Sequence, residues 1–143
     1  MRNYGYACIN QGFSSLPKSQ RITTNRTMIK RTFHDRGIEY ASELALQNLR
    51  DLRKILEWNL DNDIYFYRLS SDILPWASEY KLPDMPNFGA IHAAALSAGN
   101  FARQHNMRLT SHPGPFNKLA SPKERVFQLT KTDLSVHAQL FDL

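Results

Sequence analysis

The segment spanning residues 108–116 contains the residue with the clearest potential for chemistry in this chain. A short apolar strand runs directly into His112, and a Pro-Gly turn follows that histidine. In α/β enzymes, active sites assemble from side chains at the carboxyl ends of parallel strands. His112 is therefore the first candidate active-site residue, and the elements that position it must be identified next.

Hydrophobic patterning predicts two β/α units before His112. Residues 4–9 form an aromatic and β-branched run that indicates a first strand. Residues 38–62 place Ala45, Leu49, Leu52 and Leu56 on one face of an amphipathic helix. A buried-type second strand follows at residues 64–69. Strand, helix and strand in this order predict a right-handed parallel crossover.

The rest of the chain alternates irregular segments with regular elements. Residues 11–37 have little periodicity, and a connection of that length in a compact domain indicates a functional loop. Residues 73–86 form a second irregular segment at the same end of the predicted sheet. An Ala-rich helix is predicted at residues 88–105 and a third strand at residues 107–111. Ser121, followed by Pro122, predicts the N-cap of a final helix.

Length limits how much of an α/β barrel the chain can form. It has 143 residues, and its last residues continue a helical pattern without a cap. A (β/α)8 barrel needs about 250 residues. We therefore expect a single incomplete domain over residues 1–143, with about three β/α units, parallel strands and a barrel that does not close. An open sheet of this kind exposes edge strands and favours aggregation.

Composition narrows the class of protein. The only cysteine, Cys8, excludes a disulfide framework and is expected to be buried packing. No apolar run reaches the roughly 18 residues of a membrane span, and the N-terminus lacks the apolar region of a signal peptide. We expect an intracellular protein that is soluble and has no contact with membranes.

The positive charge is concentrated in the first quarter of the chain. Residues 1–36 contain seven Lys or Arg and one acid, whereas residues 37–143 contain eleven and twelve. A basic loop that alternates with polar residues is expected of a segment that meets phosphates. An ordinary solvated basic loop has the same composition, and this alternative stays open.

Six short groups of residues occur along the chain in a characteristic order and spacing. They are Gly5-Tyr6-Ala7-Cys8 with Asn10, Thr23-Thr24-Asn25-Arg26-Thr27, Asn48-Leu49-Arg50-Asp51-Leu52 followed by Ile55-Leu56, Tyr67-Arg68-Leu69-Ser70-Ser71, Leu74-Pro75-Trp76-Ala77-Ser78, and Ser111-His112-Pro113-Gly114 with Ser121-Pro122. No piece is specific by itself, but together they cover nearly the whole chain. In this order and spacing they resemble the ultraviolet damage endonucleases, which nick DNA beside photoproducts.

The resemblance implies a TIM barrel related to the apurinic endonuclease and sugar isomerase barrels. It also implies divalent metals at the strand ends, commonly Mn, with Zn and Mg as alternatives. His112 matches a metal ligand of the family, whereas Glu79 stands where many members have a ligating histidine. A carboxylate also ligates hard divalent ions, although Glu79 as a plain surface carboxylate stays open. The metals would generate hydroxide for phosphodiester hydrolysis on the 5′ side of pyrimidine dimers and 6-4 products.

The resemblance further implies residues that contact the lesion. Tyr6 and Asn10 match positions that face the lesion pocket, although composition alone makes Tyr6 a half-buried strand residue. Pro115 and Phe116 stand where some relatives have a Gln-Tyr pair that probes the duplex. Phe116 retains an aromatic face that can wedge between bases, while Pro115 cannot donate hydrogen bonds. The alternative is that Phe116 caps the core at the barrel mouth.

Two arginines are candidate phosphate contacts within the resemblance. Arg26 lies in the basic loop, and Arg68 lies in the second strand, where a paired buried charge is the alternative. The expected partner is double-stranded DNA carrying UV lesions, and the full-length protein is expected to be a monomer. Such a protein would work in the cytoplasm or nucleoid of a bacterial or viral system, or in a eukaryotic nucleus or mitochondrion.

The other four histidines do not occupy predicted strand ends. His34 lies in the basic loop, His92 and His105 in the second helix, and His137 in the last helix. We therefore expect them to be surface or packing residues, and no catalytic residue is assigned in the chain.

Two alternatives remain beside the endonuclease. Another metal-dependent barrel enzyme, of the abasic-site endonuclease or sugar isomerase type, would share the strand-end histidine, but the basic loop favours nucleic acid over a sugar. A non-catalytic DNA-binding remnant is the second alternative. Because three strands cannot close a barrel and the expected later ligands are absent from the 143 residues, we expect the isolated chain to be inactive or nearly so.

Overall fold

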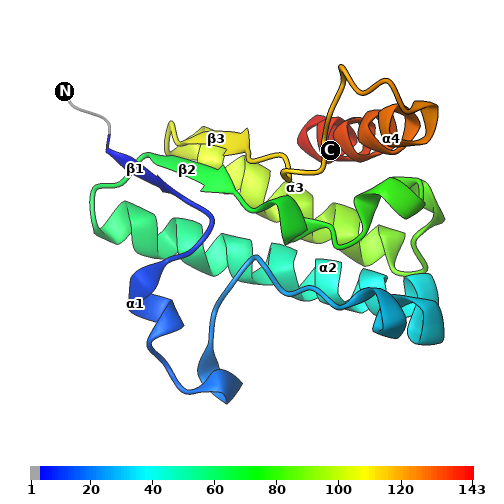
Figure 1. The fold of residues 1–143 in the computed structure, drawn as a ribbon. Coiled ribbons are helices and arrows are strands. Elements are labelled where there is room, and N and C mark those ends of the chain that lie inside the picture. The colour runs from blue at the N-terminus through cyan, green and yellow to red at the C-terminus, as the bar shows by residue number, and fades with distance from the viewer. Residues whose placement is uncertain (1–3) are drawn as a thin grey trace.

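Three parallel strands form the centre of the fold. The computed structural model describes residues 4–143, with β1 at Gly5–Ala7, β2 at Phe66–Leu69 and β3 at Arg108–Ser111. Their order in the sheet is β1-β2-β3, and Phe66 pairs with Gly5 on one side and Arg108 on the other. The open parallel sheet with helical crossovers confirms the predicted α/β class (Figure 1).

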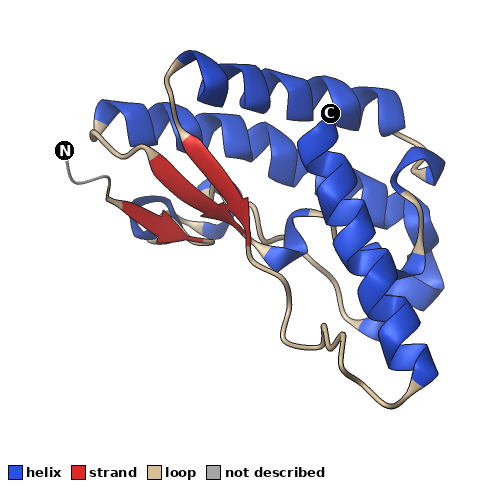
Figure 2. Ribbon diagram, turned by 90° about the horizontal axis from the view of Figure 1, so that it is seen from above, coloured by secondary structure: helices blue, strands red, loops and turns tan. Residues whose placement is uncertain are grey.

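Helices and short 3-10 turns connect the strands. The α-helices are α1 at Gln11–Ser14, α2 at Lys30–Asp61, α3 at Phe88–Gln104 and α4 at Glu124–Asp142. The 3-10 turns are η1 at Lys18–Gln20, η2 at Ser71–Ile73, η3 at Ala77–Glu79 and η4 at Leu82–Asp84. In the described part of the chain, α2 and α3 cover one face of the sheet, and no helix covers the other face (Figures 1 and 2).

The core lies between the sheet and the two covering helices. On α2, the periodic apolar residues Ala45, Leu49 and Leu52 are buried, as predicted. On β2, the side chains alternate, because Tyr67 and Leu69 are buried against the helices while Arg68 is exposed. Because of this alternation, Arg68 can reach the uncovered face of the sheet, whereas Tyr67 and Leu69 cannot.

The predicted functional loop at residues 11–37 is wrong in part. It contains the short helix α1, and its last residues, 30–36, are helical turns at the start of α2. Gly37 has φ 67° and ψ −162°, so the chain kinks there and two helical pieces join end to end. Glycine adopts this left-handed conformation without a Cβ clash, so two helical pieces can join at Gly37. The spacing of apolar residues does not reveal such a junction. His34 accordingly lies in a helix rather than in a loop.

The last helix starts later than predicted. Glu124 is the first helical residue, Lys123 occupies the N-cap position, and no side chain caps it. The Ser121 hydroxyl accepts a hydrogen bond from the Lys123 backbone N–H at 3.2 Å, within the turn before the helix. Ser121 therefore orders the preceding turn and does not cap the helix. From there α4 crosses near the carboxyl ends of the strands (Figure 2) and packs on η3.

The environment of Cys8 differs from the prediction. Cys8 is only half-buried and has a left-handed backbone with φ 65°, so the prediction of buried packing is wrong. The strand ends at Ala7, and the carbonyl of Cys8 accepts a hydrogen bond from the Tyr67 hydroxyl at 2.8 Å.

Among the helices described, none is both long and apolar enough to cross a membrane.

Candidate functional site

A cavity of about 410 Å³ opens beside the carboxyl end of β2. Segments distant in sequence meet there: the chain before α2, the turns η2 and η3, the loop before α4, and α4 itself. It brings together two residues predicted to act at the site, Glu79 and Phe116, and it does not include His112. The lining residues are Thr27, Met28, Ser71, Asp72, Leu74, Trp76, Ala77, Ser78, Glu79, Phe116, Leu129 and Asp133.

Trp76 holds the turn that carries Glu79. Its backbone is left-handed, with φ 60° and ψ 34°, an uncommon and costly conformation for an aromatic residue. Its indole N–H donates to the Met28 carbonyl at 3.0 Å, and its ring stacks on Phe33 at 4.9 Å. The Glu79 N–H then donates to the Trp76 carbonyl at 2.9 Å, which closes the turn. The Glu79 carboxylate is left exposed at the cavity.

Titratable groups from α4 and η2 meet at the wall of the cavity. Asp133 and His137 are 3% and 4% exposed, and the His137 Nε2 lies 3.9 Å from the Asp133 Oδ1. Burial lowers the pKa of His137, while the charge of Asp133 and a hydrogen bond with the Ser71 backbone act in the opposite direction. Burial also raises the pKa of Asp72. The imidazole is therefore neutral near pH 7, and its Nε2 lacks a hydrogen-bond partner among the described residues.

The loop that carries Phe116 is fixed to α4 by two hydrogen bonds. The Asn117 side-chain amide donates to the Asp133 Oδ2 at 2.8 Å, and the Lys118 backbone N–H donates to the Thr130 hydroxyl at 3.0 Å. Both acceptors are buried. Phe116 is nevertheless 52% exposed in this chain. Both interpretations, a wedge into DNA and a cap at the mouth of a closed barrel, stay predictions.

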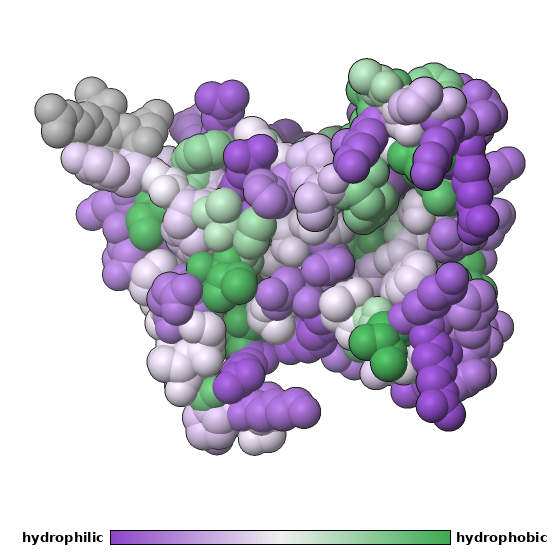
Figure 3. All heavy atoms as spheres, in the orientation of Figure 1, coloured by the Kyte–Doolittle hydropathy of each residue, from purple (hydrophilic) through white to green (hydrophobic). Residues whose placement is uncertain are grey.

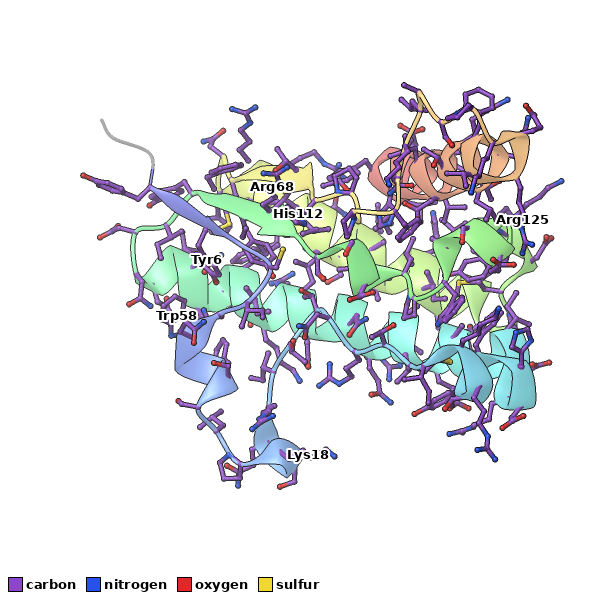
Figure 4. The ribbon with its side chains drawn as sticks, viewed as in Figure 1. Tyr6, Lys18, Trp58, Arg68, His112 and Arg125 are labelled. Carbon is purple, nitrogen blue, oxygen red and sulfur yellow. The ribbon has the colours of Figure 1, made fainter. Side chains whose placement is uncertain are left out.

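Arg68 and His112 lie on the uncovered face of the sheet, away from α2 (Figure 4). The Arg68 Nε donates to the Ser111 carbonyl at 3.2 Å, and the His112 backbone N–H donates to the Leu69 carbonyl at 3.1 Å. Both residues are exposed in this chain. The Arg68 guanidinium is accessible to a phosphate in this chain, and its two alternatives, a phosphate contact and a paired buried charge in a closed barrel, stay predictions.

Tyr6 and Asn10 lie on the helix side of the sheet instead. The Tyr6 hydroxyl donates to the Asn59 Oδ1 on α2 at 2.6 Å, and the Asn10 amide donates to the Tyr6 hydroxyl at 2.8 Å. Asn10 also caps α1 by accepting from the Phe13 N–H. Burial raises the pKa of Tyr6, so the phenol stays protonated. The structure therefore separates this pair from Arg68 and His112 (Figure 4), and its contact with a lesion stays a prediction.

Arg26 is partly buried and bound to groups of the protein itself. Its guanidinium forms a 2.7 Å ion pair with the buried Asp51 and donates to the carbonyls of Thr23 and Arg21. Three of the five N–H groups of a guanidinium are thereby engaged. Contact of Arg26 with phosphate stays a prediction, and it would use the two N–H groups that remain free.

The candidate metal ligands do not form a centre by themselves. Within residues 4–143, no group of three or more His, Cys, Asp or Glu side chains could hold a metal ion. His112 projects from the end of β3, and Glu79 lines the cavity. The remaining histidines are exposed at 34 and 92, half-buried at 105 and buried at 137. They are surface or packing residues, as predicted.

Sequence reasoning missed the buried polar group on α4. Asp133 and His137 are four residues apart, and the buried apolar residues Val136 and Leu140 share their side of the helix. Polar residues at this spacing on an apolar face are a signal of internal hydrogen bonding. Their partners Asn117 and Ser71 come from distant segments.

Comparison with known proteins places this geometry in a family. Residues 2–143 match the family model described as UV-endonuclease UvdE. The chain belongs to the UV-endonuclease UvdE family. This confirms the resemblance stated for the sequence.

Similar proteins are longer than this UvdE-family chain. It is 37% identical over 136 residues to the UV-damage endonuclease of Schizosaccharomyces pombe, covering 95% of this chain and 22% of that protein. It is 30% identical over 131 residues to the UV DNA damage endonuclease of Clostridium perfringens, covering 92% of this chain and 31% of that protein. The crystal structure of SacUVDE matches with a TM-score of 0.80 and 28% identity, covering 96% of this chain and 44% of that structure.

Proposed function

We propose that this chain contributes the lesion-contacting part of a DNA repair endonuclease that acts at UV photoproducts. The observation that carries the proposal is the anchored loop before α4, which holds Phe116 half in solvent at the edge of the cavity. An aromatic wedge of this kind can enter a duplex and unstack its bases. The similar proteins named UV-damage endonucleases favour this function over a sugar isomerase or an abasic-site enzyme.

Selectivity for pyrimidine dimers and 6-4 products would follow from the deformability of damaged DNA. Unstacking costs less at a damaged step than in an intact duplex. Pro115 has no N–H donor, and so the tip of the loop would read shape rather than base edges. The exposed Arg68 guanidinium would contact a phosphate of the same duplex.

Metal-dependent hydrolysis, with Mn as the expected ion and Zn or Mg as alternatives, is proposed only for the longer endonuclease. Glu79 and His112 supply two separate donors, which do not make up a metal centre in the described residues. No step of incision on the 5′ side of the lesion is therefore assigned to this chain. We expect the 143-residue polypeptide to bind damaged DNA and to leave it uncut.

The open sheet supports a place in a TIM barrel. In the described part of the chain, β1 and β3 each pair on one side only. The uncovered face presents Arg68 and His112, as the interior of a barrel would at its carboxyl end. Strands that pair with these two edges would close the barrel in a full-length protein, which we propose to be a monomer.

Binding to a labelled duplex with a single cyclobutane pyrimidine dimer tests the proposed function. Circular dichroism first establishes that the 143-residue chain is folded. Fluorescence anisotropy should then give a Kd at least about tenfold below that for the same undamaged sequence. Adding Mn should produce no nick. Equal affinity for the two duplexes would contradict the proposed recognition, and a Mn-dependent nick would contradict the assigned inactivity.

A further inference from the structure

We propose that Leu119 is a second apolar contact to damaged DNA, acting beside Phe116, and that Lys118 and Lys123 bind the adjoining phosphates. The proposal rests on the proposed function and adds residues to it. Together these side chains make up the wedge loop, defined here as residues 115–123.

Exposed apolar side chains gather in the wedge loop. Leu119 is 60% exposed, and Phe116 lies three residues before it. Both line a shallow hollow of about 780 Å³, whose other apolar walls include Pro115, Pro122 and Val126. Figure 3 shows hydrophobic atoms at the top of the molecule, over the loop before α4, with hydrophilic atoms around them. Neighbouring apolar groups of this kind, rimmed by polar ones, mark a binding surface.

The wedge loop is held in one shape. Its Asn117 and Lys118 hydrogen-bond to Asp133 and Thr130, which are 3% and 0% exposed on α4. Phe116 and Leu119 therefore stay in solvent on an ordered loop. A preorganised loop loses less conformational entropy on binding, which favours a wedge over a disordered tail.

Charge identifies the partner as nucleic acid. The Lys118 and Lys123 side chains line the same hollow, and both are exposed. Arg125 adds a third cation at the start of α4 (Figure 4), and none of the three has a carboxylate within ion-pair distance in the described structure. Unpaired cations around an apolar pair match a duplex, which offers phosphates beside bases that can be unstacked.

Substitution of Leu119 tests the second contact. We expect Leu119→Ala to raise the Kd for the photoproduct duplex about tenfold and to change the Kd for undamaged DNA much less. Leu119→Met, which keeps apolar bulk, should retain the preference for damage. Phe141→Ala removes another exposed apolar side chain at the far end of α4 and should leave both values unchanged.

Substitution of the lysines tests the phosphate contacts. Lys118→Ala and Lys123→Ala should weaken binding to both duplexes equally, and each should make the negative slope of log K against log salt less steep by about 0.9. Lys131→Ala is the control, because Lys131 is exposed further along α4. Salt slopes unchanged from the wild-type chain would overturn this part of the proposal.

The outcomes separate this inference from the proposed function. If the wild-type chain does not prefer damaged DNA, the proposed function fails. If the wild-type chain prefers damage and folded Leu119→Ala does so equally, the wedge role of Leu119 is wrong while the proposed function stands. If Leu119→Ala leaves both DNA affinities unchanged, Leu119 does not contact DNA. The exposed apolar surface would then be a contact site for another protein, and the proposal is overturned.

Discussion

The basic segment before and at the start of α2 and the wedge loop use their charges differently. In the first, Arg21 donates to the Leu16 carbonyl and Arg26 pairs with the buried Asp51, whereas Arg31–Asp35 and Arg36–Glu43 are exposed pairs at 3.8 and 3.9 Å. In the second, two lysines lie exposed beside two apolar side chains. Lys18 and Lys30 of the basic segment are exposed and without an ion pair in the described structure as well. The wedge loop therefore differs in its two neighbouring exposed apolar side chains, Phe116 and Leu119, and not in its number of free cations.

This difference teaches that part of the charge of a basic segment can support the fold instead of contacting a ligand. The ion pair of Arg26 with the buried Asp51 is an internal support of the segment, because Lys54 and the Thr23 N–H also bind that carboxylate. The wedge loop places its internal support elsewhere, on Asp133 and Thr130. Its side chains are thereby left for a partner.

Removing Asp51 should have the largest effect on stability. We expect Asp51→Ala to lower the free energy of unfolding by about 2 kcal/mol, because the partly buried Arg26 and the Thr23 N–H lose their acceptor. Urea denaturation measures this value. Glu57→Ala, which breaks the exposed Arg53–Glu57 pair, should cost less than about 0.5 kcal/mol. Equal losses in the two variants would mean that the basic segment is not internally supported.

Phe116→Ala should act on binding rather than on stability. Loss of the aromatic face should weaken binding to the photoproduct duplex by about 1–2 kcal/mol, roughly tenfold in Kd. The free energy of unfolding should change little, because half of the ring is already in solvent. Anisotropy titrations and urea melts on one preparation separate the two effects. A destabilised variant with unchanged selectivity would make Phe116 a packing residue.

Asp133→Ala should release the wedge loop from α4. We expect a loss of about 1 kcal/mol in stability and a reduced preference for damaged DNA, because Asn117 loses its acceptor. Asp133→Asn keeps a side-chain oxygen and should retain most of the preference. If Asp133→Ala binds with full selectivity while folded, the anchor does not position the loop.

Acid should weaken the fold through His137. Burial lowers the pKa of His137 in the folded chain, so below the ordinary value of about 6.5 the unfolded chain takes up the proton first. The stability contribution is present above pH 6.5 and is lost as the pH falls toward the folded-state pKa, by at most about 1.4 kcal/mol per pH unit. Thermal melts at pH 7.5, 6.5 and 5.5 measure this loss. His137→Gln should show a smaller decrease than the wild-type chain, and an identical decrease would exclude His137 as the cause.

The regular elements could be predicted from the sequence because their patterns are local. The helix at residues 38–62 and the strands around residues 66–69 and 108–111 follow from periodicity. The predicted helix began too late, at residue 38, because the left-handed Gly37 joins it to a helical piece that starts at Lys30. Ser121 was expected to cap a helix that in fact begins three residues later, after a turn that the hydroxyl stabilises.

The candidate site could be predicted only in part. Glu79 and Phe116 were found through family motifs, and the structure brings them to one cavity. Asp72 and Asp133 were not found, because they meet only after α4 folds back toward the end of β2. The internal partner of Arg26 was also missed, since Asp51 lies 25 residues away on another element.

Amide hydrogen exchange with and without the photoproduct duplex tests the central claim most directly. That claim is that the wedge loop, rather than the basic segment, makes the main contact with damaged DNA. We predict that added DNA slows exchange most at residues 115–123 and less at residues 18–36. Slowed exchange at residues 18–36 with none at residues 115–123 would contradict the account.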